Sequence, residues 1–64
     1  DYNLTPKEIE IIKFVYKGLS SKEIANLTQR SEETIKSQRK SILAKTNCKT
    51  MTDVIVLAGK NGWV

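Results

Sequence analysis

Two helix-start signals of the same kind stand 15 residues apart, and they restrict the fold of this chain more than any other feature. In "TPKE", Thr5 is followed three residues later by Glu8, and in "SSKE", Ser20 is followed three residues later by Glu23. In such a capping box, the hydroxyl and the carboxylate each accept a hydrogen bond from a backbone N–H that the helix leaves free. Pro6 strengthens the first signal because no N–H is needed at the first helical position. The sequence therefore predicts two short, separate helices near its N-terminus.

Two more helices are predicted in the rest of the chain. Ser31 is expected to cap a third helix over about 32–45, with acids in its first turn, where the helix dipole favours them. Thr50 or Thr52 is expected to cap a fourth helix over about 51–60. We find no alternating strand pattern, no repeat and no low-complexity linker. The predicted fold class is all-α, a four-helix domain containing a helix-turn-helix.

Each predicted helix has an apolar side and a residue suited to ending it. Gly18 and Asn47 are expected to end the first and third helices in the left-handed conformation, which Gly and Asn tolerate best. The side chains expected to pack inward are Ile9, Ile11, Ile12, Phe14, Val15 and Leu19, then Ile24, Ala25 and Leu27, then Ile35 and Ile42, and finally Met51, Val54, Ile55, Leu57 and Ala58. A core of this size suits one small domain.

The cysteine and histidine content excludes several chemistries. A single Cys48 cannot form an internal disulfide, and without any His a Cys/His zinc site is excluded, so we expect no metal and no other cofactor. Cys48 is expected to be a small buried hydrophobe. Because Cys48 has no base nearby in sequence and every acid fits a cap or a helix surface, we do not expect an enzyme.

The expected location is the cytoplasm. No run approaches the roughly 20 apolar residues of a membrane span, and the N-terminus lacks a secretory signal pattern, so no membrane partner is expected. Because the chain begins with Asp1 rather than Met, we expect residues 1–64 to be one domain of a longer protein.

The net charge of +4 is localised rather than diffuse. The whole excess lies between Ser20 and Lys49, and no acid occurs from Thr34 to Thr52. A localised basic stripe suits a polyanionic partner better than diffuse charge does.

On a helical wheel of the third helix, one side offers short polar groups and lysines. Lys36, Ser37 and Lys40 lie away from Ile35 and Ile42. Hydroxyl and ammonium groups can contact base edges and phosphate oxygens, and a slim helix without a central acid can enter a major groove. Arg39 lies at the edge of the packing side, from which it can reach a phosphate.

The segments "LTPKEIEIIKFVYKGLSSKEIA" and "SEETIKSQRKSILAKTN" resemble the LuxR-type (GerE/FixJ/NarL-type) DNA-binding domain of bacterial transcriptional regulators. The resemblance covers nearly the whole chain with uninterrupted spacing. The matching residues are Leu4, Thr5, Lys7, Glu8, Glu10, Ile11, Ile12, Val15, Gly18, Ser20, Lys22, Glu23, Ile24, Ala25, Ser31, Thr34, Ile35, Lys36, Ile42 and Lys45.

This resemblance implies the C-terminal domain of a longer regulator that binds duplex DNA sequence-specifically, with its third helix in the major groove. The implied base contacts are Lys36, Ser37 and Lys40. The expected phosphate contacts are Ser20, Ser21, Lys22, Ser31, Thr34, Arg39, Lys45, Lys49 and Thr50. The fourth helix is expected to form a weak homodimer through Asp53, Val56 and Lys60, and RNA polymerase is a further possible partner.

The chain departs from the family pattern mainly at the turn of the helix-turn-helix. Thr28, Gln29 and Arg30 stand where the family usually has Leu, Gly and an aliphatic residue; Gln38 replaces His, and Thr46 replaces Leu. Gln29 in a left-handed turn would cost roughly 1 kcal/mol relative to Gly. The Thr28 hydroxyl is expected to bond a backbone carbonyl one turn back.

Two alternatives stay open, one from another functional class and one a related helix-turn-helix domain. A helical protein-interaction module could dock an acidic partner on the basic stripe; an apolar groove would favour it, and we find none in the sequence. The promoter-reading part of a sigma factor is a second helix-turn-helix possibility, distinguished by co-purification with RNA polymerase core.

Overall fold

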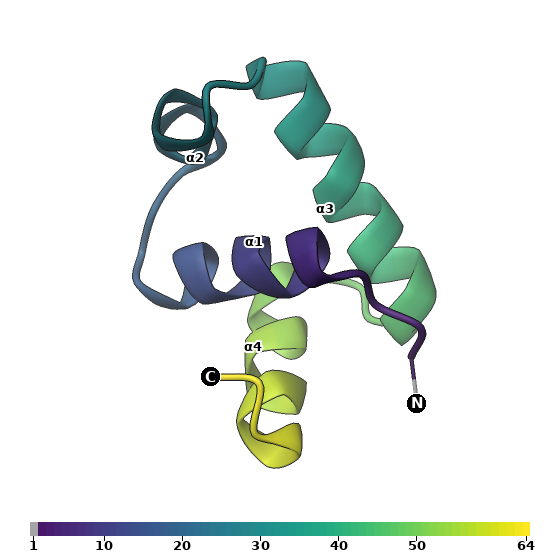
Figure 1. Cartoon of the computed structure of the whole chain (residues 1–64). Coiled ribbons are helices and arrows are strands. Elements are labelled where there is room, and N and C mark those ends of the chain that lie inside the picture. The colour runs from purple at the N-terminus through teal and green to yellow at the C-terminus, as the bar shows by residue number, and fades with distance from the viewer. Residues whose placement is uncertain (1) are drawn as a thin grey trace.

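The computed structural model describes residues 2–64, which form four helices and no strand (Figure 1). The helices are α1 (Pro6–Tyr16), α2 (Ser21–Thr28), α3 (Glu32–Thr46) and α4 (Met51–Asn61). The predicted all-α class is confirmed, and the third and fourth helices each end one residue later than predicted. Thr50, rather than Thr52, caps α4. Asp1, on which the expectation of a longer protein is based, lies outside the described residues.

Both predicted capping boxes are formed. The Thr5 hydroxyl accepts from the Glu8 backbone N–H at 3.1 Å, and Glu8 Oε1 accepts from the Thr5 N–H at 2.9 Å. The corresponding distances between Ser20 and Glu23 are 3.2 and 2.8 Å. These bonds satisfy N–H groups that the first helical turn leaves unpaired, which is why α1 and α2 begin where the sequence predicts.

The turns between the helices are held by residues in the left-handed conformation. Asn47 ends α3 with φ of 57°, and Gly18 follows α1 with φ of 93°. Gln29 ends α2 with φ of 57° and ψ of 42°, as expected, although it is not glycine. The Thr28 hydroxyl donates to the Ile24 carbonyl at 2.7 Å, so this expectation is also confirmed.

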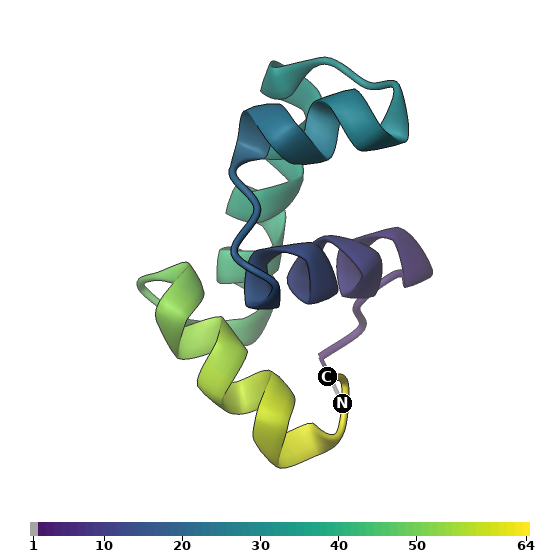
Figure 2. The same cartoon turned by 90° about the vertical axis from the view of Figure 1, so that its left-hand side faces the viewer.

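The helices form two packed groups, α2 with α3 and α1 with α3 and α4, which share α3. α2 packs chiefly against α3, whereas α1 contacts both α3 and α4, and α4 also contacts α3. Figure 1 shows α1 crossing between α3 and α4, and Figure 2 shows the first described residues and the C-terminus at the same end of the molecule. The rings of Tyr2 and Trp63 meet there edge to face, with centroids 5.6 Å apart.

The core draws on all four helices. Its buried apolar residues are Ile11, Ile12, Ile24, Ala25, Ile35, Ile42, Met51, Val54 and Ala58. The prediction that Leu27 packs inward is wrong, because 64% of Leu27 is exposed. The buried stripe of α2 is centred among Ile24, Ala25 and Thr28, and Leu27 lies about 110° around the helix from that centre. Cys48 packs against the core but is only half-buried.

Candidate nucleic-acid interface

The three residues predicted to contact bases lie together on the exposed side of α3. Ile35 and Ile42 are 0% exposed and fix the inward side of this helix. Lys36, Ser37 and Lys40 are all exposed. Because burial uses only the narrow opposite stripe, this side of α3 is free to meet a partner.

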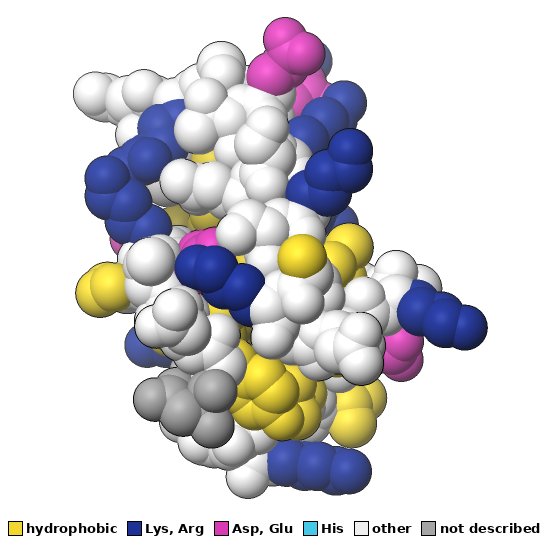
Figure 3. All heavy atoms as spheres, turned by 90° about the vertical axis from the view of Figure 1, so that its right-hand side faces the viewer, with side chains coloured by type: hydrophobic (Ala, Val, Ile, Leu, Met, Phe, Trp, Pro, Cys, Tyr) yellow, Lys and Arg dark blue, Asp and Glu magenta, His cyan; other side chains and the backbone are white. Residues whose placement is uncertain are grey.

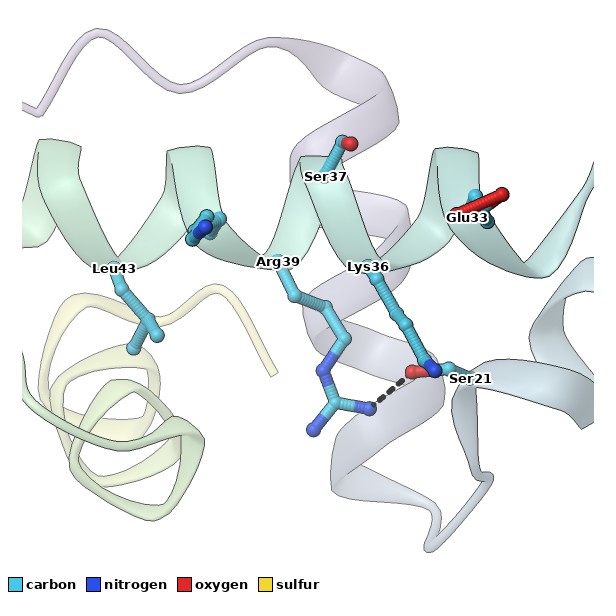
Figure 4. A pocket seen from close by; sticks show the side chains of 7 residues that line it. Ser21, Glu33, Lys36, Ser37, Arg39 and Leu43 are labelled. Atoms are coloured by element: carbon cyan, nitrogen blue, oxygen red, sulfur yellow. Dashed lines mark hydrogen bonds between the residues drawn. The ribbon is translucent and has the colours of Figure 1, made fainter.

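A first groove runs along α3 on the side of α2 (Figure 4), and we call it the α2-side groove. Its lining residues are Ser21, Glu33, Lys36, Ser37, Arg39, Lys40 and Leu43. In Figure 4, Lys36 and Arg39 extend to the same side of α3, towards Ser21. The side chains are mostly charged or polar, so this groove suits a polar partner.

Arg39 connects the two helices of the helix-turn-helix. Its Nη1 donates a hydrogen bond to Ser21 Oγ at 2.9 Å, across 18 residues of sequence. A guanidinium has five N–H donors, and this bond uses one of them. Arg39 can therefore hold the start of α2 against α3 and still donate to a phosphate.

A second groove runs along the other side of α3, next to the first turn of α1, and we call it the α1-side groove. Its lining residues are Thr5, Lys7, Glu8, Glu33, Thr34, Ser37, Gln38 and Ser41. Glu33 and Ser37 line both grooves, so they lie on the ridge between them. Figure 3 shows this face of the molecule, with a largely uncharged strip over α3, acidic side chains at the upper end of that strip and basic side chains on both sides of it.

The charge of Lys36 is partly balanced by an acid at the start of α3. Lys36 Nζ lies 3.4 Å from Glu32 Oε2, and both side chains are largely exposed. Exposed pairs of this kind contribute little to stability because water and salt screen them. Lys36 can therefore exchange Glu32 for an anionic partner at small cost.

The hydroxyl groups predicted to contact phosphates serve as helix caps. Ser20 and Ser31 accept from the backbone N–H groups of Glu23 and Thr34 at 3.2 and 3.0 Å, and Thr50 accepts from the Asp53 N–H at 3.3 Å. Each cap uses an oxygen lone pair, and a hydroxyl also has a proton to donate. The remaining candidates near the helix ends, Lys22, Thr34 and Lys49, are exposed.

Lys45 differs from the other phosphate candidates because it has a partner within the protein. Lys45 Nζ donates to Glu8 Oε1 at 2.8 Å, and Ser41 Oγ donates to Glu8 Oε2 at 2.9 Å. Burial by itself would raise the pKa of Glu8, but the hydrogen bonds from Lys45, the Thr5 N–H and Ser41 outweigh it and lower that pKa below 4.5. Glu8 is therefore a buried carboxylate whose charge is balanced by Lys45.

This role of Glu8 is not apparent from the sequence. The capping box explains one of its bonds, but Ser41 and Lys45 lie 33 and 37 residues further along the chain. No local spacing rule connects positions that far apart. The structure shows that Glu8 holds the first turn of α1 against α3.

The residues predicted for the dimer interface share the outward side of α4. Asp53 and Lys60 are exposed, and Val56 is 56% exposed, opposite the buried Val54 and Ala58. Within residues 2–64, no cluster of three His, Cys, Asp or Glu side chains is placed to bind a metal ion. Nor does any helix of that region have the length and apolar character needed to cross a bilayer.

A short helix, a tight turn at Gln29 and a longer helix with a polar, basic outer side define a helix-turn-helix DNA-binding domain. Residues 2–58 match the family described as "Bacterial regulatory proteins, luxR family", and the chain belongs to this family. The resemblance found in the sequence is thereby confirmed.

Similar proteins are named as regulators rather than enzymes. "Transcriptional regulatory protein DegU" of Brevibacillus brevis is 36% identical over 61 residues, covering 95% of this chain and 26% of that protein. "Transcriptional regulatory protein YdfI" of Bacillus subtilis (strain 168) is 39% identical over 59 residues, covering 92% and 28%. "Uncharacterized response regulatory protein YgeK" of Escherichia coli (strain K12) is 34% identical over 62 residues, covering 97% and 42%. The chain thus spans less than half the length of these relatives.

Proposed function

We propose that residues 1–64 are the sequence-specific DNA-binding domain of a longer bacterial transcriptional regulator of the response-regulator type, acting in the cytoplasm. Family membership supports DNA-binding regulation, and the names of the relatives support the regulatory role. The greater length of those relatives supports a further domain in the same protein.

The observation that carries the proposal is the grouping of Lys36, Ser37 and Lys40 on the exposed side of α3. A helix with its side chains is about 10–12 Å across, which matches a major groove about 12 Å wide. In the proposed complex α3 lies in this groove, the lysines donate to guanine O6 and N7, and the short Ser37 on the ridge allows close approach.

Phosphate contacts in the proposed complex come from both ends of α3 and from the start of α2. The proposed contacts are Ser20, Ser21, Lys22, Ser31, Thr34, Arg39, Lys45, Lys49 and Thr50. Lys45 is the weakest of these, because its charge is already balanced by Glu8. Such contacts set the register of the protein on the duplex, and they make binding sensitive to salt.

The proposed dimer forms through the outward side of α4, around Val56 with Asp53 and Lys60 at the rim. A two-fold pair would place two α3 helices on half-sites about one turn of DNA apart. So small an apolar patch makes this dimer weak in the isolated domain. Contact with RNA polymerase is part of the proposal only for the longer protein.

Selection of bound sequences from a random duplex pool, followed by fluorescence anisotropy over a salt series, tests the proposal. Affinity should fall by about 0.9 log units per log unit of salt for each phosphate contacted. Lys36→Ala should cost about 1–3 kcal/mol and relax the preference at one base pair. Lys49→Ala should weaken binding to all duplexes alike. Absence of binding at every salt concentration, or binding insensitive to salt, would overturn the proposal.

A further inference from the structure

One lysine, Lys7, lines the α1-side groove. We propose that Lys7 binds a phosphate of the DNA strand that runs along the α1 side of α3, opposite the strand contacted near α2. The inference rests on the proposed function, because it assumes that α3 lies in the major groove.

A helix in the major groove has one sugar-phosphate backbone on each side, because the groove is about as wide as the helix. On the side of α2, the groove is lined by Arg39, a proposed phosphate contact, which supplies a cation for the backbone of one strand. On the side of α1, Lys7 is the cation among the groove-lining residues. A phosphate on this second side therefore meets Lys7 first.

Lys45 does not replace Lys7 on this side. Its ammonium group lies 2.8 Å from the buried Glu8 carboxylate, so the pair carries no net charge. Moving Lys45 to a phosphate would leave Glu8 buried without its partner, which is costly in a protein interior. The other residues that line the α1-side groove are uncharged, apart from Glu33 on the ridge and Glu8, whose charge Lys45 balances.

The position of Lys7 beside α3 is fixed by its neighbour. Glu8 accepts hydrogen bonds from Ser41 and Lys45 of α3, so the first turn of α1, with Lys7 in it, is held against the groove. Within residues 2–64 the ion pairs are Lys36–Glu32 and Lys45–Glu8, which leaves the exposed Lys7 without an acidic partner. Its ammonium group is therefore available to an anion.

Helix stability does not explain a lysine at this position. Lys7 is the second residue of α1, where the positive end of the helix dipole disfavours a cation. The basic side chains on both sides of the largely uncharged strip in Figure 3 are the arrangement that two flanking backbones require. Lys7 thus matches a phosphate in charge, exposure and location.

The test compares two lysines of α1 on the duplex that the unmodified protein selects. Lys7→Ala should weaken binding about eightfold at about 0.1 M salt and reduce the salt slope by about 0.9, the loss of one phosphate contact. Lys13→Ala removes the same charge from an exposed site that lines a different groove with Tyr16 and Trp63, and it should change neither quantity. Lys7→Arg should retain the slope, and thermal unfolding should show that all variants remain folded.

Duplexes carrying one neutral methylphosphonate at successive positions locate the contact. Neutralising one particular phosphate should lower the affinity of the unmodified protein. The same substitution should leave the affinity of Lys7→Ala unchanged. If the unmodified protein binds DNA but Lys7→Ala behaves like Lys13→Ala, the Lys7 inference is overturned while the proposed function stands. If the unmodified protein does not bind DNA, the proposed function itself fails.

Discussion

Replacing Glu8 by Gln tests whether the long-range carboxylate network holds the domain together. The side chain is 5% exposed and accepts from the Thr5 N–H, Lys45 and Ser41 at 2.8–2.9 Å. Gln has nearly the same shape, so its amide oxygen can still accept from Thr5 and its amide nitrogen can donate to the Ser41 hydroxyl. The substitution therefore removes the charge while leaving the packing nearly unchanged.

The size of the effect follows from the geometry of the ion pair. Removing one partner of a fully buried pair costs about 3–5 kcal/mol. The Lys45 side chain is 31% exposed, so its ammonium group can turn to water when Glu8 is replaced. The stability lost should therefore be close to the contribution of one charge-assisted hydrogen bond. We therefore expect Glu8→Gln to lower the free energy of unfolding at pH 7 by about 1.5–3 kcal/mol. In a domain of this size, each 1 kcal/mol lowers Tm by about 4–8 °C.

The same effect should depend on pH in a defined direction. The pKa of Glu8 is lower in the folded protein than its ordinary value of 4.5. Its stabilising contribution is therefore complete above the unfolded pKa and is lost as the pH falls through the folded pKa. The stability difference between the unmodified protein and Glu8→Gln should shrink steadily below about pH 4.5.

Urea unfolding followed by far-ultraviolet circular dichroism, from pH 7 to pH 3, measures both quantities. Glu10→Gln is the matched control, because Glu10 is an exposed acid on the same helix. It should change stability by less than about 0.5 kcal/mol. A Glu8→Gln protein as stable as the unmodified one at pH 7, or a difference that does not decrease on acidification, would refute the role assigned to this network.

Three further substitutions probe other parts of the structure. Gln29→Gly should raise stability by about 0.5–1 kcal/mol in urea unfolding, because glycine adopts the positive φ without strain; a loss of stability would contradict this. Arg39→Met should reduce DNA affinity about eightfold at about 0.1 M salt, the loss of one phosphate contact in anisotropy, and unchanged affinity would show that Arg39 only joins the helices. Val56→Asp should leave Tm nearly unchanged but abolish any self-association in sedimentation equilibrium; an unaffected dimer would place the interface elsewhere.

The helices could be predicted because their signals are local. A capping box joins residues three apart, so Thr5 with Glu8 and Ser20 with Glu23 indicate helix starts without knowledge of the fold. The inward side of α3 was predictable for a similar reason, since Ile35 and Ile42 stand at helical spacing within a long helix. Once Ile35 and Ile42 define the inward side of α3, the helical wheel alone places Lys36 on the exposed side.

The errors occurred where periodicity was short or contacts were distant. α2 has eight residues, and two turns of helix do not define the centre of an apolar stripe, so the sequence predicts the wrong side for Leu27. The two grooves beside α3 could not be predicted, because they depend on where α1 and α2 pack. The role of Lys7 only becomes visible once α1 is placed against α3.

The bond between Glu8 and Lys45 also changes how the charge of this surface is interpreted. Counted from the sequence, Lys45 is one of the cations of an acid-free stretch, and it suggests a phosphate contact. In the folded domain its charge stabilises a buried carboxylate, and the same bond positions Lys7 on the surface nearby. Lys45 of the acid-free stretch thus supports the fold, and Lys7 of α1, far from Lys45 in sequence, supplies a cation on the surface instead. The cations available to DNA are therefore determined by the packing of α1 against α3 and not by the charge of α3 alone.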